Sequence, residues 1–411
     1  MKIANVDVKT LKEKYNTPLY IYDINHIKDN INKYKNSFKS ENFNTEIAFA
    51  SKAFQIKEML RIVNDSNISL DSVSLGELYT AKVVGFPMEN IYFHGNNKSY
   101  EELEFALDNN VGHIVVDNYM ELVDLEELAK SKNKLVNILI RLNLGVEAHT
   151  HKFIVTSHVD SKFGVSYGNE EFNNMMLLIN KSNNIKLDGF HSHIGSQIFD
   201  LSGFYAAIEK LIVISKDYSY DMILNIGGGF GVRYTANDSP IPFDLVSNKL
   251  IIETERLLKK HNTRIKKLVI EPGRSIVAEA GYTLYTIGNI KKTLNKKYYF
   301  IDGGMTDNIR PALYEAKYNA DIIGKENAVK NQIVSIAGKC CESGDVIIEH
   351  IALPEAKKGD LLITYTTGAY GYTMSSNYNK ALRPAVVFVE DGKDKLVVKR
   401  QTLEELINNE I

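Results

Sequence analysis

The stretch Glu46-Ile-Ala-Phe-Ala-Ser-Lys-Ala-Phe54 contains a short β-prone run that ends abruptly at Lys52. Small residues flank this lysine, and no acidic residue follows it until Glu58. An amine among apolar neighbours loses its proton more readily, and a neutral amine attacks aldehydes. The alternative interpretation is a solvated lysine at the end of a strand, since buried lysines are uncommon. The rest of the chain decides between the two.

Seven further β-prone runs follow this one, and segments with helical spacing of apolar residues separate them. Eight β/α units between about residues 45 and 271 predict a closed parallel barrel of the TIM type, (β/α)8. An open doubly wound sheet is the alternative, because short apolar runs are easily miscounted. The eight predicted strands are Glu46–Ala50, Ile68–Val73, Ile91–His94, His113–Asp117, Val136–Asn143, Leu187–His193, Met222–Ile226 and Lys267–Glu271.

Polar residues gather at the carboxyl ends of these strands, which converge on one mouth in a barrel. They are Lys52, Asp71, His94, Arg141, His193, the glycines Gly227–Gly229 and the segment Glu271–Arg274. Because active sites of such barrels are built at this mouth, the clustering predicts an enzyme.

After about residue 280 the runs are β-prone and separated by turns, with little helical periodicity, which predicts an antiparallel β-domain. The run Pro18–Tyr22 near the N-terminus is expected to join it. We therefore predict a barrel domain at residues 26–278 and a β-domain formed by residues 1–25 and 279–411. The runs are Tyr282–Ile290, Lys297–Asp302, Val334–Ala337, Asp345–Ile351, Asp360–Tyr365 and Ala385–Val389.

Composition excludes several classes of protein. A hydrophobic content of 44% and a net charge of −2 argue against disorder and against a nucleic-acid surface. The sequence contains no run of about 18 apolar residues, so no membrane span is predicted. The only cysteines, Cys340 and Cys341, are adjacent and poorly placed to pair with each other, so a reduced, cytoplasmic protein is expected. The loop Gly145–Gly164 contains three histidines without a familiar ligand spacing, and we expect a lid or surface loop rather than a metal site.

Together these residues match what pyridoxal 5'-phosphate (PLP) needs from a protein, namely an amine, a phosphate cradle, a partner for the pyridine nitrogen, a stacking face and a general acid. Lys52 is the amine, and the run Asn225–Gly231 lets backbone N–H groups approach a phosphate. Glu271 supplies a carboxylate for the pyridine nitrogen, and His193 supplies a ring. Cys341 supplies an acidic thiol. Each assignment has an alternative. Glu271 could belong to a structural ion pair, the glycine run could be a tight turn, His193 could be a core histidine, and Cys341 could be a buried structural thiol.

The chain resembles the diaminopimelate decarboxylases, which are PLP-dependent decarboxylases with an alanine-racemase-type barrel and a β-domain. The resemblance runs from about Tyr15 to Arg400. The motifs that carry it are Ala50–Ala53, Asp71–Glu77, Phe93–Lys98, Gly145–His151, His191–Gln197, Ile226–Gly231, Glu271–Ser275, Asp302–Met305, Arg310–Tyr314, Cys341–Asp345 and Gly368–Tyr370.

The resemblance implies decarboxylation of meso-2,6-diaminopimelate to L-lysine and CO₂, the last step of lysine biosynthesis, in a homodimer whose subunits share the active site. It assigns the PLP Schiff base to Lys52, ring stacking to His193 and the pyridine nitrogen to Glu271. The phosphate would be held by Ser196, Gly227, Gly228, Gly229 and Tyr370. The distal carboxylate of the substrate would be bound by Arg274, Arg310 and Tyr314, while Cys341, as proton donor, and Glu342, as ligand of an amino group, would reach in from the partner subunit.

Other members of the same scaffold class are alternatives. Decarboxylases of ornithine, lysine, arginine or carboxynorspermidine fit less well, since two arginines suit a distal carboxylate rather than an ammonium group. An alanine-type racemase would use a tyrosine acid, and a non-catalytic PLP carrier would lack the β-domain. The chain departs from the usual pattern of the family at Phe49, Leu144, Ser157 and Lys339, and none of these positions carries an inferred chemical group.

Overall fold

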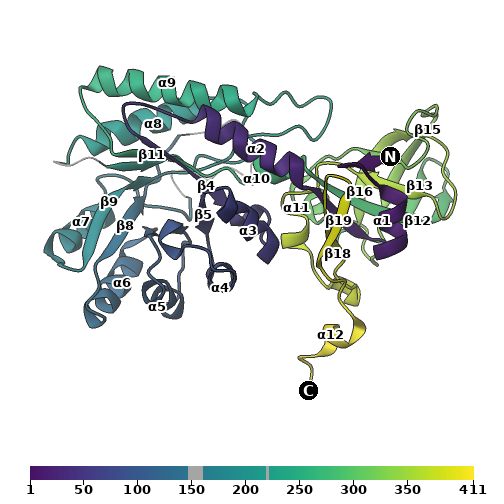
Figure 1. Ribbon diagram of the computed structural model, residues 1–411, viewed down its shortest axis with the longest axis horizontal. Coiled ribbons are helices and arrows are strands. Elements are labelled where there is room, and N and C mark those ends of the chain that lie inside the picture. The colour runs from purple at the N-terminus through teal and green to yellow at the C-terminus, as the bar shows by residue number, and fades with distance from the viewer. Residues whose placement is uncertain (147–160, 219–221) are drawn as a thin grey trace. The chain divides into compact units, whose positions relative to one another are not determined.

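The computed structural model describes residues 1–146, 161–218 and 222–411, which form two compact units (Figure 1). The barrel unit contains Asn30–Gly231 and Pro240–Gly273. The β-unit contains Met1–Asp29, Val232–Ser239 and Arg274–Ile411. The three histidines of the predicted lid loop, His149, His151 and His158, lie outside the described residues.

Eight parallel strands close into a barrel in the order β10-β11-β4-β5-β6-β7-β8-β9. Each predicted strand appears within a few residues of its expected bounds, so the predicted barrel is confirmed and the open sheet is wrong. The strands are β4 (Asn44–Ala50), β5 (Ser69–Ser72), β6 (Ile91–Phe93), β7 (His113–Val116), β8 (Val136–Arg141), β9 (Ile185–His191), β10 (Ile223–Asn225) and β11 (Lys267–Ile270).

Side chains from six strands fill the inside of the barrel with one apolar layer. These residues are Ala48, Tyr92, Val115, Leu139, Ile223 and Val269, and all are almost completely buried. Such a packed layer closes the interior, so the polar groups beyond the strand ends face a mouth with a solid floor.

Several of the helices that follow the barrel strands begin at capping residues. Ser99 and Glu102 form a reciprocal capping box, and the side chains of Ser74 and Asn118 each accept a backbone N–H at the start of a further helix. The helices that accompany the barrel strands are α2 (Ile24–Ser37), α3 (Lys57–Asp65), α4 (Leu75–Val83), α5 (Tyr100–Asp108), α6 (Tyr119–Ser131), α7 (Glu170–Lys181), α8 (Ser202–Ser215) and α9 (Phe243–His261). No helix of the described ranges is long and apolar enough to span a bilayer.

The β-unit is built on a sheet of order β16-β15-β13-β12-β3-β18-β19, with β17 pairing to both β12 and β14. The predicted β-domain and its N-terminal strand are therefore confirmed. Most pairs are antiparallel, but β13 with β15 and β18 with β3 are parallel, and each of these pairs has the long connection that parallel pairing needs. The strands are β3 (Leu19–Asp23), β12 (Gly281–Lys292), β13 (Lys297–Ile301), β14 (Ala320–Ile322), β15 (Gln332–Ala337), β16 (Val346–Leu353), β17 (Leu361–Thr364), β18 (Ala385–Glu390) and β19 (Lys393–Val398).

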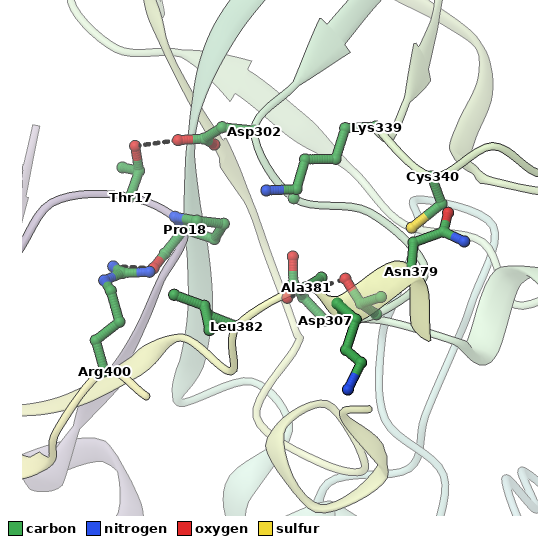
Figure 2. A pocket seen from close by; sticks show the side chains of 13 residues that line it. Thr17, Pro18, Asp302, Asp307, Lys339, Cys340, Asn379, Ala381, Leu382 and Arg400 are labelled. Atoms are coloured by element: carbon green, nitrogen blue, oxygen red, sulfur yellow. Dashed lines mark hydrogen bonds between the residues drawn. The ribbon is translucent and has the colours of Figure 1, made fainter. Parts of the chain in front are cut away.

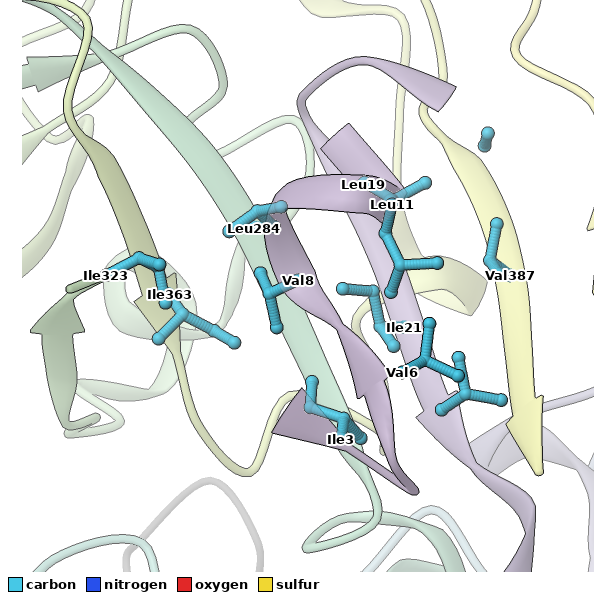
Figure 3. Packing of buried hydrophobic residues seen from close by; sticks show 12 residues of the cluster. Ile3, Val6, Val8, Leu11, Leu19, Ile21, Leu284, Ile323, Ile363 and Val387 are labelled. Carbon is cyan, nitrogen blue, oxygen red and sulfur yellow. The ribbon is translucent and has the colours of Figure 1, made fainter. Parts of the chain in front are cut away.

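The N-terminal segment covers one face of this sheet. The hairpin of β1 (Lys2–Ile3) and β2 (Val6–Asp7) and the helix α1 (Val8–Tyr15) place Val8 and Leu11 against Ile21, Leu284 and Val387 of the sheet strands (Figure 3). Burial of these side chains holds the N-terminus on the unit. The remaining helices are α10 (Arg274–Val277), α11 (Arg310–Tyr314) and α12 (Leu403–Ile407).

Candidate active site

Lys52 lies at the mouth of the barrel, in the single 3₁₀ turn η1 (Ser51–Ala53) that follows β4. Ser51 and Ala53 are fully buried, whereas the Lys52 side chain is exposed. Two carboxyl groups lie near Lys52. Burial raises the pKa values of Asp71 and Glu77, and the charge of Lys52 opposes that rise. The amine is therefore presented at the mouth beside two carboxyl groups that the local sequence around Lys52 does not reveal.

Glu271 directly follows β11 and is 5% exposed. Its Oε1 accepts hydrogen bonds from His94 Nε2 at 2.8 Å and from Asn225 Nδ2 at 2.6 Å, and its Oε2 lies 3.3 Å from His191 Nε2. Burial alone would raise the pKa of this carboxyl group, but His94 and His191 lower it well below its usual value. Glu271 is thus a buried carboxylate that is held ionised by donors from three different strand ends.

Both histidines of the motif His191–Gln197 are electrically neutral at physiological pH. Burial lowers the pKa of His191 to about 3, and burial together with the charge of Lys52 lowers the pKa of His193 well below its usual value. His193 Nδ1 accepts a hydrogen bond from the backbone N–H of Gly228 at 3.2 Å. A neutral His193 ring, anchored at Nδ1 to the glycine turn, suits stacking on an uncharged or cationic ring.

The atoms of His94, His191 and Glu271 lie within 4.8 Å of one another, a grouping that is also typical of metal ligands. However, each facing imidazole nitrogen already has a carboxylate oxygen of Glu271 as its partner. The three side chains therefore satisfy one another, and the arrangement is that of a positioned carboxylate.

The glycine run after β10 is required by close backbone contacts. A Cβ at Gly228 would lie 2.0 Å from the carbonyl oxygen of Glu271, and a Cβ at Gly229 would lie 2.2 Å from that of Gly195. Gly227 has φ +70°, a conformation that glycine adopts without steric cost. This turn is thereby packed against the segments that carry both Glu271 and Ser196, and Ser196 itself is partly exposed.

A second cluster lies within the β-unit, where two buried arginines meet tyrosines. Arg274 Nη1 donates to the hydroxyl of Tyr234 at 2.6 Å, and Arg310 Nη1 donates to that of Tyr318 at 2.5 Å. The ring of Tyr370 lies 4.9 Å from the guanidinium of Arg274 and 5.9 Å from that of Arg310. Burial raises the pKa of Tyr234, but the two guanidinium groups outweigh it and lower that pKa overall.

No acidic side chain of the described ranges forms an ion pair with Arg310, which is 7% exposed. A buried cation costs several kcal/mol unless it is compensated, so this guanidinium suits an anionic ligand. Tyr314 is half-buried at the end of α11, and Tyr318 rather than Tyr314 contacts Arg310. Tyr234 and Tyr318 were not predicted as site residues, since nothing in their local sequence pattern places them beside the arginines.

Cys341 and Glu342 are exposed in the turn between β15 and β16. A cavity of about 450 Å³ lies beside this turn, and Lys339, Cys340, Asp307 and Asn379 are among its lining residues (Figure 2). Burial, followed by the charge of Asp345, raises the pKa of the Cys340 thiol to about 11. Cys340 is therefore a protonated thiol beside the cavity, while Cys341 points to solvent.

The sequence model of the pyridoxal-dependent decarboxylases, pyridoxal binding domain, matches residues 24–278. The barrel is thus that of a pyridoxal-dependent decarboxylase. The chain is 47% identical to the diaminopimelate decarboxylase of Bacillus subtilis (strain 168), over 99% of this chain and 94% of the relative, and 41% identical to that of Staphylococcus aureus (strain COL), over 100% and 97%. The chain belongs to the diaminopimelate decarboxylase family.

Solved structures agree with this assignment. Diaminopimelate decarboxylase from M. jannaschii is 33% identical with a TM-score of 0.90, covering 98% of this chain and 94% of that chain. The enzyme from Helicobacter pylori, complexed with L-lysine, is 32% identical with a TM-score of 0.89, covering 98% of both chains. A lysine/ornithine decarboxylase from Vibrio vulnificus, at 22% identity and a TM-score of 0.76, shares the fold.

The residues at the barrel mouth fit the PLP that this family uses. Glu271 is an ionised carboxylate of the kind that keeps a pyridine nitrogen protonated. The glycines Gly227–Gly229 leave no Cβ between the backbone and a phosphate, and Lys52 is presented as an amine.

Proposed function

We propose that this protein decarboxylates meso-2,6-diaminopimelate to L-lysine and CO₂ with PLP as its cofactor. The observation that carries the proposal is the buried, ionised Glu271, held by His94, His191 and Asn225 at the mouth of a barrel that also presents Lys52. The name shared by relatives along the full length of the chain supports the choice of substrate.

When bound, PLP supplies an electron sink for the pair of electrons that the departing CO₂ leaves on the substrate. Lys52 provides the amine that binds the cofactor covalently and later accepts or donates protons there. Glu271 holds a proton on the pyridine nitrogen, and His94 and His191 keep Glu271 ionised for that task. His193 stacks on the ring in its neutral form.

The cofactor's phosphate is assigned to Ser196, to the backbone N–H groups of Gly227, Gly228 and Gly229, and to the hydroxyl of Tyr370. The support for this assignment is the absence of any Cβ in the glycine turn. Before a phosphate binds, the backbone N–H groups of Gly227 and Gly228 donate to Asn225 Oδ1 and His193 Nδ1, so these two groups would exchange those acceptors for phosphate oxygens. Successive backbone N–H groups are effective ligands of phosphate oxygens.

The distal carboxylate of the substrate is assigned to Arg274, Arg310 and Tyr314. Arg310 supports this assignment because it is buried among phenol groups and the described residues offer it no carboxylate. A guanidinium group binds a carboxylate in bidentate fashion. Lysine and ornithine present an ammonium group at this end, which two guanidinium groups would repel.

Proton delivery to the carbon that loses CO₂ is assigned to the Cys341 thiol, and a substrate amino group is assigned to Glu342. Both side chains are exposed in one turn of the β-unit, as groups offered to a partner subunit would be. We propose a homodimer in which this turn completes the active site of the partner.

The pyridoxal-binding domain is assigned to residues 26–278, in keeping with the family match at residues 24–278, and the β-domain to residues 1–25 and 279–411. The two cysteines are free thiols, which suits the reducing conditions of the cytoplasm, and we place the enzyme there.

The test is decarboxylation by the purified protein with added PLP, with meso-diaminopimelate, L-lysine, L-ornithine and L-arginine offered in parallel. CO₂ and L-lysine are expected from diaminopimelate alone. Lys52→Ala should abolish turnover and the absorbance of the covalently bound cofactor. Turnover of a diamine precursor would contradict the carboxylate assignment of Arg310, and full activity of Lys52→Ala would contradict the chemistry itself.

A further inference from the structure

The turn from Gly338 to Asp345 carries Cys341 and Glu342 and ends at a buried carboxylate that the proposed function does not use. We propose that Asp345 is a positioning residue: it fixes the backbone of this turn and thereby holds the Cys341 thiol where it delivers its proton. This inference rests on the proposed function of Cys341.

Asp345 is only 3% exposed, and it forms hydrogen bonds with the turn at several points. Its Oδ2 accepts the backbone N–H of Cys340 at 2.8 Å, and its Oδ1 accepts that of Met305 at 2.6 Å. Its own backbone accepts from Gly338 at 2.9 Å and donates to Glu342 at 3.1 Å. One residue thus ties together both ends of the turn, its middle and the neighbouring segment that contains Met305.

Two glycines leave room for this carboxylate. A Cβ at Gly338 would lie 2.2 Å from Asp345 Oδ2, and a Cβ at Gly304, where φ is +152°, would lie 2.5 Å from Oδ1. Both distances are shorter than any real contact, so side chains at these positions would displace the carboxylate. The backbone at these two glycines therefore leaves a space that the Asp345 carboxylate fills.

Three successive backbone N–H groups of the turn have acceptors from three different segments. Lys339 donates to the carbonyl of Gly303 at 3.0 Å, Cys340 donates to Asp345, and Cys341 donates to Asn379 Oδ1 at 2.9 Å. Asn379 has φ 52°, and it lines the same cavity as Cys340 (Figure 2). The backbone at Cys341 is therefore fixed on one side while its thiol faces outward, which is the arrangement of a group presented to a substrate.

The turn must therefore keep a fixed distance between the Cys341 thiol and the carbon that loses CO₂. One CO₂ leaves and one proton is added to the same carbon, so each CO₂ is matched by one lysine when the thiol is in place. If the thiol were displaced after CO₂ has left, the proton would be added to the cofactor instead of to the substrate carbon. Water would then cleave the bond between that carbon and its nitrogen, so that the amino group would stay on the cofactor, the remaining chain would leave as an aldehyde, and lysine would not be formed. A purely structural role of Asp345 would lower CO₂ and lysine together.

Asp345→Asn keeps the size of the side chain but places an amide NH₂ against one of the two N–H donors. We expect lysine formation from diaminopimelate to fall about 100-fold, as for a displacement of about 1 Å in a reacting group. CO₂ release should fall less, so the ratio of lysine to CO₂ drops below one. A ratio that stays at one, at whatever rate, overturns the proposal.

The matched control is Asp360→Asn in the same unit. Asp360 also accepts a backbone N–H, from Lys357 at 2.9 Å, but in a turn that carries no proposed site residue. This variant should keep a ratio of one and a rate close to that of the wild type. If the ratio of lysine to CO₂ also dropped in Asp360→Asn, the loss of any hydrogen bond between a carboxylate and a turn N–H would explain the effect. That result would overturn the proposed role of Asp345.

Asn379 provides a second test if Asp345→Asn folds poorly. Asn379→Gly removes the acceptor at a position whose positive φ glycine tolerates, whereas Asn379→Asp keeps an acceptor oxygen. The ratio should fall in Asn379→Gly and recover in Asn379→Asp. Equal ratios in the two variants would overturn the proposed fixing of Cys341.

Amide hydrogen exchange makes the test independent of activity. The amides of Cys340 and Cys341 should exchange at least 10-fold faster in Asp345→Asn than in the wild type, and unchanged exchange overturns the proposal. A wild-type protein that releases no CO₂ from diaminopimelate would instead overturn the proposed function, and the exchange data would still decide whether Asp345 fixes the turn.

Discussion

The barrel mouth and the arginine cluster of the β-unit solve opposite problems of buried charge. Glu271 is a buried anion, and His94, His191 and Asn225 surround it with donors. Arg310 is a buried cation, and its described neighbours are the phenol groups of Tyr234, Tyr318 and Tyr370. The first charge is compensated by donors within the protein, whereas the described residues offer the second charge no carboxylate.

From this difference we infer that the barrel mouth holds a permanent group and that the arginine cluster selects a transient one. A carboxylate that three donors already hold in place keeps one orientation and one charge, as a resident cofactor requires. A guanidinium that the described residues leave without a carboxylate gains most when a substrate carboxylate binds, so it contributes to affinity and selection. Four predictions test this contrast, from the largest expected effect to the smallest.

Glu271→Gln should lower kcat about 100- to 1,000-fold, as loss of one preorganised electrostatic contact at a reacting centre does. The amide cannot keep the pyridine nitrogen protonated, so the absorbance of the bound cofactor should shift as well. Measurement of kcat and of the absorbance spectrum at saturating PLP checks both. A variant with a normal spectrum and normal kcat would break the assignment of the barrel mouth.

Arg310→Met should raise KM for diaminopimelate about 10- to 100-fold, because one charge-assisted hydrogen-bonded contact is lost. The spectrum and affinity of the bound cofactor should stay unchanged, since the described contacts of Arg310 lie within the β-unit. Steady-state kinetics and a PLP titration measure the two quantities. If cofactor affinity fell instead of substrate affinity, the contrast between the two clusters would be lost.

His191 makes the stability of the apo-protein sensitive to acid. Burial lowers its pKa from 6.5 to about 3, so the folded protein keeps it neutral while the unfolded chain takes up a proton below about pH 6.5. Stability from this group is complete above pH 6.5 and is lost as the pH falls towards 3, by about 2 kcal/mol at pH 5.

The matching variant is His191→Gln, whose amide also donates to Glu271 but does not titrate. Its unfolding free energy should depend less steeply on pH between 7 and 5 than that of the wild type, as measured by urea denaturation. Parallel curves for the two proteins would show that His191 is not the group that titrates.

Tyr318→Phe should raise KM for diaminopimelate about fivefold, because the hydroxyl that orients Arg310 is removed while the ring remains. Tyr15→Phe serves as the control, since the Tyr15 hydroxyl bonds to Asp394 outside both clusters. The Tyr15 variant should keep the KM of the wild type. Equal changes in both variants would point to general destabilisation.

The barrel could be predicted from sequence because its strands alternate regularly with helices. Lys52, His193 and Glu271 each stand at or just beyond a strand end, so counting strands was enough to group them at one mouth. The β-unit was predicted less completely. The weakly apolar strand β19 and the short strand β14 were missed, because three residues or an exposed edge give no clear alternation.

Asp71 and His94 were expected at the same mouth as Lys52, but the individual contacts of both clusters could not be predicted, because the partners come from distant parts of the chain. Tyr318 meets Arg310 after a turn that contains a left-handed residue at Glu315, and the motif Arg310–Tyr314 ends before Tyr318 is reached. Asp71 and Glu77 approach Lys52 only because parallel strands place their ends together. Local patterns carry no information of this kind.

The hydrogen bond from the backbone N–H of Lys339 also affects which substitutions this position can accept. Proline at this position would rigidify the unfolded chain but would have no N–H to offer the carbonyl of Gly303. Proline would gain about 0.4–1 kcal/mol of stability from reduced chain entropy, and the lost hydrogen bond would cost about 0.5–1.5 kcal/mol. The two alternatives nearly balance, so drift between them is close to neutral and leaves the reactive turn in place.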